Sequence, residues 1–162
     1  MKYLMVIITS LFFTLNLRAQ TEKVSKTRFV IGLSDPELLH AGVTFRIANA
    51  SQLGLNVGAG PTLGGVWPAI SLEHRLYVGK DNERVNQKTW FFRQGTTFFT
   101  SAESPQQFTL NLTVGKDLLF KNIKNGITID AGLFYLPRDE RSSTGRSFFL
   151  VPALRFEFYF AL

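Results

Sequence analysis

The clearest pattern in the chain is a strict alternation of positions from residue 147 to residue 162. One side carries large apolar residues and a proline, from Phe148 to Leu162, whereas the other side includes Arg155 and Glu157. A period of two predicts a β-strand whose two faces meet different surroundings. The segment is longer than a usual soluble strand of about five or six residues. It matches a tilted strand that crosses a bilayer, which needs about nine to eleven residues.

Seven earlier segments of similar length also alternate, and turn-forming residues separate them. All the predicted strands together are residues 26–33, 41–48, 53–61, 69–79, 88–100, 107–115, 127–136 and 147–162. An even number of antiparallel strands with hairpin-length connections predicts an all-β fold, an eight-stranded up-and-down transmembrane barrel. After the N-terminal segment no apolar run approaches the roughly eighteen residues of a membrane-spanning helix, which excludes a helical membrane protein.

The composition of the two faces decides which one should point outward. The less apolar face holds mostly Thr, Ser, Asn and Gly, with single charges of both signs. Such a face is a poor water-facing surface but a suitable filling for a barrel interior, which in an eight-stranded barrel is only just wide enough for side chains. We therefore expect the apolar face to meet lipid. The alternative is a soluble periplasmic lipid-binding barrel, in which the apolar face would point inward.

The first nineteen residues form a separate unit. Lys2 supplies a positive charge, residues 4–15 form a short apolar stretch, and Ala19 precedes the expected cleavage site. This pattern predicts a secretory signal peptide, because the apolar stretch is too short to span a membrane. The expected organisation is a signal peptide at residues 1–19 and an outer-membrane β-barrel at residues 20–162. Loss of Lys2 and Arg18 would lower the formal charge from +6 to +4.

Few residues able to carry out chemistry are present. The chain has no cysteine and two histidines, so thiol catalysis is excluded. His40 follows the first turn and is expected to be a solvated loop residue, whereas His74 has lipid-facing parity. Neither a nucleophile with a positioned base nor a cofactor or metal motif is visible. We therefore expect no enzymatic activity, no cofactor and no metal. The basic residues are scattered, so nucleic acid is not an expected partner.

Charged residues on the inner face give the most informative pattern. Inward parity is shared by five arginines and three acidic residues, namely Arg28, Arg46, Glu73, Arg75, Arg93, Asp130, Arg155 and Glu157. Isolated charges in a narrow interior are costly, so we expect these side chains to pair with one another and to plug the barrel. The alternative is a small pore in which the excess of arginine favours anions.

The hairpin around Arg84 allows a prediction of strand register. With the turn centred there, residues whose numbers sum to about 168 should face each other. His74 then faces Gln94, and each of these two polar exceptions on the apolar face can satisfy the other's hydrogen bond. The same register sets Arg75 opposite Arg93. Like charges directly opposite are destabilising, so we expect an inner carboxylate to bridge them.

The signal peptide ending in Ala19-Gln20, the alternating segments and the aromatic C-terminal strand carry a resemblance to a known family. The chain resembles the small eight-stranded outer-membrane barrels of the OmpA/OmpX kind, in the broad outer membrane protein beta-barrel domain family. The resemblance covers nearly the whole mature chain and implies the outer membrane of a Gram-negative-type bacterium. The chain departs from the family by ending in Ala161-Leu162, since such proteins usually end in an aromatic residue.

The resemblance implies a structural or surface-interaction role, although this fold also hosts adhesins and a few lipid-modifying enzymes. The implied partners are outer-membrane lipid, lipopolysaccharide and the barrel-assembly machinery. The mixed-charge loop at residues 137–146 is a candidate contact for a partner at the cell surface. A lipid-modifying barrel enzyme is the alternative. His74 is its only candidate catalytic side chain, and Ser71 has the wrong parity to serve it.

Overall fold

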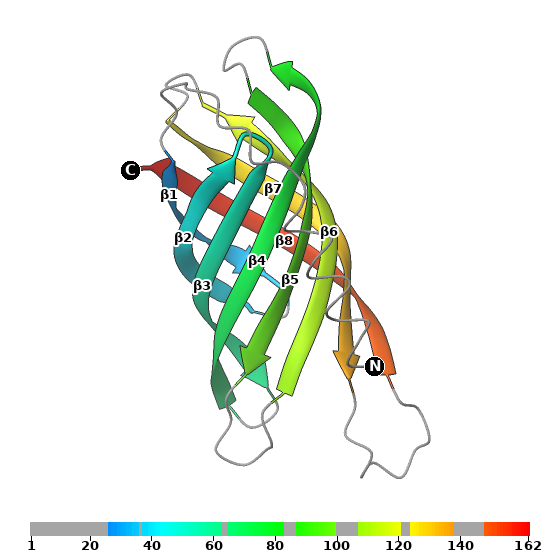
Figure 1. Ribbon diagram of the computed structural model, residues 1–162. Coiled ribbons are helices and arrows are strands. Elements are labelled where there is room, and N and C mark those ends of the chain that lie inside the picture. The colour runs from blue at the N-terminus through cyan, green and yellow to red at the C-terminus, as the bar shows by residue number, and fades with distance from the viewer. Residues whose placement is uncertain are drawn as a thin grey trace.

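The computed structural model describes residues 26–35, 37–62, 65–82, 87–99, 107–120, 124–137 and 148–162. In this part of the chain, eight antiparallel strands form a closed barrel in sequence order (Figure 1). The strands are β1 (Thr27–Ser34), β2 (Leu39–Ala48), β3 (Ser51–Thr62), β4 (Gly65–Asn82), β5 (Gln87–Phe99), β6 (Gln107–Leu119), β7 (Asn125–Pro137) and β8 (Phe148–Ala161). The predicted all-β fold is thus confirmed. The predicted signal peptide lies outside the described residues.

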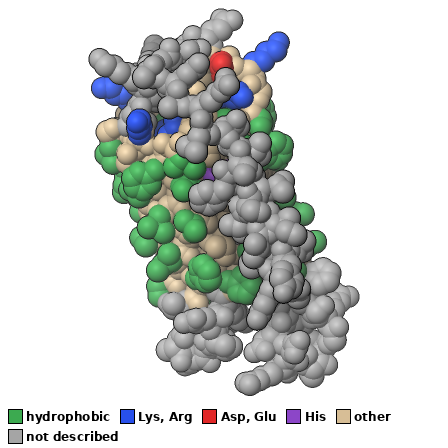
Figure 2. Space-filling model, in the orientation of Figure 1, with side chains coloured by type: hydrophobic (Ala, Val, Ile, Leu, Met, Phe, Trp, Pro, Cys, Tyr) green, Lys and Arg blue, Asp and Glu red, His purple; other side chains and the backbone are tan. Residues whose placement is uncertain are grey.

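The alternation in the sequence corresponds to an exposed outer face and a buried inner face of the barrel wall. On β8 the Leu154 side chain is 66% exposed, whereas its neighbours Ala153 and Arg155 are buried in the barrel. The other strands repeat this arrangement, so large apolar side chains cover the sides of the barrel (Figure 2). In the part of the chain that the structure describes, no helix is long and apolar enough to cross a membrane.

Strands β4 and β6 extend furthest beyond their predicted ends. β4 begins at Gly65 and ends at Asn82, so it occupies much of the connection expected at residues 61–68. β6 continues to Leu119, although a turn was expected from Lys116 onward. The prediction of a turn was wrong because the alternation persists: Leu118 stays on the outer face, and Asp117 points inward opposite Thr128 of β7.

The register of the β4–β5 hairpin is the one predicted from its turn. Leu76 pairs with Phe92, His74 with Gln94, and Arg75 with Arg93. A β-bulge interrupts the ladder only near the turn, between Val78 and Asp81. The predicted parity of the less regular strand β5 is therefore correct, and Arg93 faces the interior.

The β1–β2 hairpin ends earlier than its neighbours. The last residue pair between β1 and β8 is Ser34 with Arg155, followed by one hydrogen bond from Asp35 N to Leu154 O at 3.0 Å. β8 begins at Phe148, so it continues past this point. On the other side β2 begins at Leu39 opposite Ala59, whereas β3 continues to Thr62. The turn of this hairpin consequently lies within reach of the barrel interior.

Candidate functional site

The interior of the barrel holds all eight charged side chains for which the sequence predicted inward parity. Seven of them are almost fully buried, and only Arg46 is half-buried. They come from six strands, because Glu73 and Arg75 share β4 while Arg155 and Glu157 share β8. A barrel of eight strands brings such inward side chains within contact distance across its narrow interior.

Glu73 lies at the centre of this interior. Its carboxylate accepts hydrogen bonds from Arg75 Nη2 at 2.7 Å, from Arg93 Nη1 at 3.2 Å and from Arg155 Nη1. The carboxylate that was expected to bridge Arg75 and Arg93 is therefore Glu73 itself. Glycines flank it on both neighbouring strands, Gly54 on β3 and Gly95 on β5. A Cβ at Gly54 would lie 2.7 Å from Glu73 Oε1, so the absence of a side chain there makes room for the carboxylate.

Glu157 forms the second centre of the network. It accepts a hydrogen bond from Arg75 Nη2 at 2.5 Å, and its Oε1 lies 2.9 Å from Arg155 Nε. β4 and β8 are four strands apart in this barrel, so the pairs Arg75–Glu157 and Arg155–Glu73 join opposite walls. Asp130 of β7 completes the network through Arg93 Nη2 at 2.8 Å. These ion pairs cross the full width of the interior.

His40 belongs to this network, which corrects its expected position in a solvated loop. Its side chain is fully buried, with its ring nitrogens 2.9 Å from Glu157 Oε1 and 3.1 Å from Ser34 Oγ. The expectation was wrong because β2 begins at Leu39, which makes His40 an inward-facing strand residue. The short turn before it leaves no room for a solvated loop.

A second cluster lies toward the end of the barrel that carries the C-terminus. Arg28 Nη1 donates to Asp117 Oδ2 at 2.9 Å, and the same carboxylate accepts hydrogen bonds from Tyr77 at 2.9 Å and Thr128 at 2.8 Å. The guanidinium of Arg28 also stacks 4.4 Å from the ring centroid of Tyr159. Sequence reasoning missed Asp117 because it was assigned to a turn. The outward parity of its neighbours Lys116 and Leu118 is the sequence signal that could have identified Asp117 as an inward-facing residue.

Arg46 stands apart from both clusters. Its guanidinium donates to Gln87 Oε1 at 2.8 Å and lies 5.9 Å from the ring centroid of Tyr77. It is half-buried because β2 and β3 end close to it, where the ladder shifts between Arg46 and Ala48. Its inward parity is as expected, but its hydrogen bond is to an amide.

The buried arginines and carboxylates of the interior balance in number when the turn residue Glu37 is left out. Among the described residues, the buried arginines Arg28, Arg75, Arg93 and Arg155 match the buried carboxylates Glu73, Asp117, Asp130 and Glu157 in number. Glu37 is a fifth buried acid, carried into the interior by the β1–β2 turn. Burial raises the pKa of its carboxyl group above its usual value. A protonated Glu37 would leave the interior close to neutral.

Comparison with known proteins bears on the fold. No protein-family model matches the chain, and no curated protein sequence matches it. A solved structure, the crystal structure of the N-terminal β-barrel domain of Pseudomonas aeruginosa OprF, is similar, with a TM-score of 0.53 and 12% sequence identity. The match covers 83% of this chain and 95% of that domain. The two chains share one fold. The predicted OmpA/OmpX-like barrel architecture is therefore confirmed.

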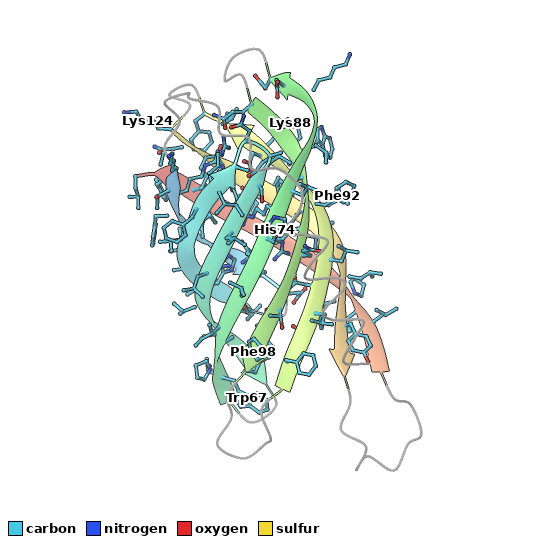
Figure 3. The ribbon with its side chains drawn as sticks, in the orientation of Figure 1. Trp67, His74, Lys88, Phe92, Phe98 and Lys124 are labelled. Atoms are coloured by element: carbon cyan, nitrogen blue, oxygen red, sulfur yellow. The ribbon has the colours of Figure 1, made fainter. Side chains whose placement is uncertain are left out.

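Among the described residues, the outer face of this OprF-like barrel carries a hydrogen-bonded polar cluster around His74. His74 Nδ1 lies 3.2 Å from Gln94 Nε2, as the register predicted, and His74 Nε2 lies 2.6 Å from Ser51 Oγ. Sequence reasoning did not find Ser51, because the predicted strand began at residue 53, whereas β3 begins at Ser51 opposite Leu76 of β4. Among the described residues, the partner of His74 Nδ1 is an amide and not a carboxylate, the group that commonly orients a histidine acting as a base. Figure 3 shows His74 midway along the barrel.

The polar cluster gives a prediction for stability. Gln94→Leu alone is expected to destabilise the folded barrel by about 1–3 kcal/mol, because it removes a partner of His74 where water is scarce. Adding His74→Leu should recover most of that loss, because apolar groups then replace both partners. Urea unfolding of the two single variants and the double variant in lipid vesicles measures the coupling. Additive losses would show that the two side chains do not interact.

Proposed function

We propose that the protein is an outer-membrane β-barrel of a Gram-negative-type bacterium with a structural or surface-interaction role, and that its interior is plugged by the ion-pair network. The observation that carries the proposal is the closed barrel with an apolar outer surface and a charged interior. Leu112, for example, is 62% exposed on β6, while its neighbours Asn111 and Thr113 are buried inside. Closed barrels are the β-structures that satisfy every backbone group within a bilayer.

The interior supports a plug. Three strands lie between the partners of the Arg75–Glu157 and Arg155–Glu73 pairs on either side of the wall, so an ion that crossed the barrel would have to displace these pairs. The balance of buried arginines and carboxylates gives no excess of positive charge that would favour anions. The charged interior also argues against a soluble barrel that holds lipid, because such a cavity would need an apolar lining.

The polar cluster at His74 favours a non-enzymatic role. A lipid-modifying enzyme needs a nucleophile, a base and a group that orients the base. Ser51 and His74 are in contact, but the group at the other ring nitrogen is the Gln94 amide. The proposed partners are the lipid and lipopolysaccharide around the apolar surface and the machinery that assembles such barrels. The loop at residues 137–146, proposed to meet a surface partner, lies outside the described residues apart from Pro137.

Cell fractionation and gel migration test the proposal. The protein should fractionate with outer membranes and should migrate differently on a gel before and after boiling, because a folded barrel resists detergent until it is heated. In planar bilayers the folded protein should show no steady anion-selective conductance. Recovery in the soluble periplasmic fraction would contradict the membrane location, and steady anion-selective channels would contradict the plug.

A further inference from the structure

All five lysines that the structure describes lie at the same end of the barrel. Each of them lies at or next to the end of a strand, on the side of the barrel that carries the C-terminus and the β4–β5 turn. We call this group the lysine rim, which consists of Lys26, Lys80, Lys88, Lys116 and Lys124. Figure 3 labels Lys88 and Lys124 at this end and Trp67 at the opposite end, and Figure 2 shows lysine and arginine side chains gathered there. Such clustering of one charge type indicates an anionic partner.

The backbone at the β4–β5 turn presents two of these lysines. Gly79 has a φ of 88°, which favours glycine, and it lies in the β-bulge between Val78 and Asp81. The bulge leaves Lys80 outside the ladder and exposed. Asp81 pairs with Lys88 across the hairpin and is the one exposed acidic side chain in the described part of this rim. The lysines therefore outnumber the acidic side chains.

The lysine rim coincides with an aromatic boundary on the outer surface. Trp90 is 51% exposed and pairs with Lys116, whose Nζ lies 5.0 Å from the indole ring. The next outward residues toward the middle of the barrel, Phe92 and Val114, are apolar and exposed. Tryptophan at such a boundary marks the headgroup level of a bilayer. A lysine beside it can keep its stem on the apolar surface while its ammonium group reaches the lipid phosphates.

We propose that the lysine rim binds the headgroups of anionic phospholipids in the leaflet that surrounds the end of the barrel with the C-terminus. This inference rests on the proposed function, because only a membrane-embedded barrel holds Trp90 and Lys116 at headgroup level. Each basic residue near an anionic membrane surface contributes a preference of about fivefold for the anionic lipid. Lys88 and Lys116 lie on the neighbouring strands β5 and β6 and flank Trp90, so their effect should be measurable at that side chain.

Lipid-specific quenching of Trp90 tests the inference. The chain has two tryptophans, so Trp67→Phe leaves Trp90 as the sole fluorophore. This variant is folded into phosphatidylcholine vesicles that contain a minor fraction of either brominated phosphatidylglycerol or brominated phosphatidylcholine. At low salt the phosphatidylglycerol should quench Trp90 with a severalfold higher apparent affinity. About 1 M salt should remove most of this preference, because it shortens the screening length to about 3 Å.

Two further variants locate the effect. Lys88→Gln with Lys116→Gln should bring the quenching by the two brominated lipids close to equality. As a control at the other end of the barrel, Phe98→Trp in a chain with both natural tryptophans replaced by phenylalanine should report no preference. Phe98 suits this purpose because it is exposed on the outer face of β5 and pairs with Phe108, far from the lysine rim.

Each contrary outcome has one meaning. Equal quenching of Trp90 by the two lipids overturns the lysine rim as a lipid site, and so does a preference that survives the lysine substitutions. The same preference at the Phe98→Trp sensor would show a general effect of anionic lipid and would also overturn it. In every sample, heat-modifiable migration reports insertion. A protein that does not insert into either vesicle contradicts the proposed membrane barrel instead.

Discussion

Glu73→Gln is expected to destabilise the barrel by about 3–5 kcal/mol, because it breaks buried ion pairs by removing one partner. Glu73 is shared by three arginines, Arg75, Arg93 and Arg155. A neutral amide retains the shape of the side chain but leaves an excess of positive charge in the interior. Urea unfolding of the barrel in lipid vesicles at neutral pH measures the loss.

Glu37→Gln is the matched control for this substitution. Glu37 is as deeply buried as Glu73, but burial raises the pKa of its carboxyl group above the usual value. The amide has the shape and neutrality of the protonated carboxyl group, so Glu37→Gln should destabilise the barrel by no more than about 1 kcal/mol. Equal losses for the two variants would show that the acids of the interior are interchangeable and would contradict the assigned charge balance.

The Glu37 variant also has a pH dependence of known sign. An acid whose pKa is raised on folding favours the folded state below its unfolded pKa of about 4.3, and this contribution is lost as the pH rises through the folded pKa. The wild-type protein should therefore lose stability relative to the Glu37→Gln variant as the pH increases above about 4.3. The difference in unfolding free energy between the two proteins, followed with pH, checks this sign.

Leu112→Arg is expected to cost about 2–4 kcal/mol of folding free energy, because it places a cation on the lipid-facing side near the middle of the bilayer. Leu118→Arg is the matched control. It lies on the same strand and face, but close to the lysine rim, where the cost should fall to about 0–1 kcal/mol. Folding yields and urea midpoints of the two variants in vesicles measure the difference. Similar losses at both depths would contradict a bilayer around β6.

The parts of the fold that follow from a period of two could be predicted from the sequence. Strand β5 is irregular in composition, yet the turn near Arg84 was enough to fix its register with β4. That register set His74 opposite Gln94 and Arg75 opposite Arg93. It did not identify which carboxylate bridges the arginines, because Glu73, Asp130 and Glu157 all share the inner face.

The parts that depend on where strands end could not be predicted in the same way. Neighbouring strands decide these limits through their hydrogen bonds, so the polar residues at 34–40 and from 116 onward resembled loops. For this reason His40, Glu37 and Asp117 were missed, although each occupies the interior. Ser51 was missed for the same reason, because the predicted strand began at residue 53 and β3 begins at Ser51. The charged residues found from parity alone were those within long regular strands.

Within the described part of the chain, the early end of the β1–β2 hairpin leaves the edge of β8 before Leu154 and the edge of β3 after Ala59 without a paired strand. Unpaired strand edges favour pairing with a further chain. The carbonyl of Leu154 points toward β1, since it accepts from Asp35 N. Alternate residues present their backbone groups to the same side of a strand. Pro152 therefore lies at the unpaired part of this β8 edge, and a proline has no backbone N–H to donate there.

The same holds on β3. Arg46 N donates to the carbonyl oxygen of Lys26, the residue before β1, so Phe45 presents its backbone groups to Leu53 of β3. Every second residue after Leu53 presents its backbone groups to the same side of β3, so Pro61 lies at the unpaired part of the β3 edge. Proline is tolerated at such sites because no ladder hydrogen bond is lost there. Because neither proline has a backbone N–H, an added strand would lack one hydrogen-bond donor at each edge. We expect this to disfavour edge-to-edge aggregation of the partly assembled barrel.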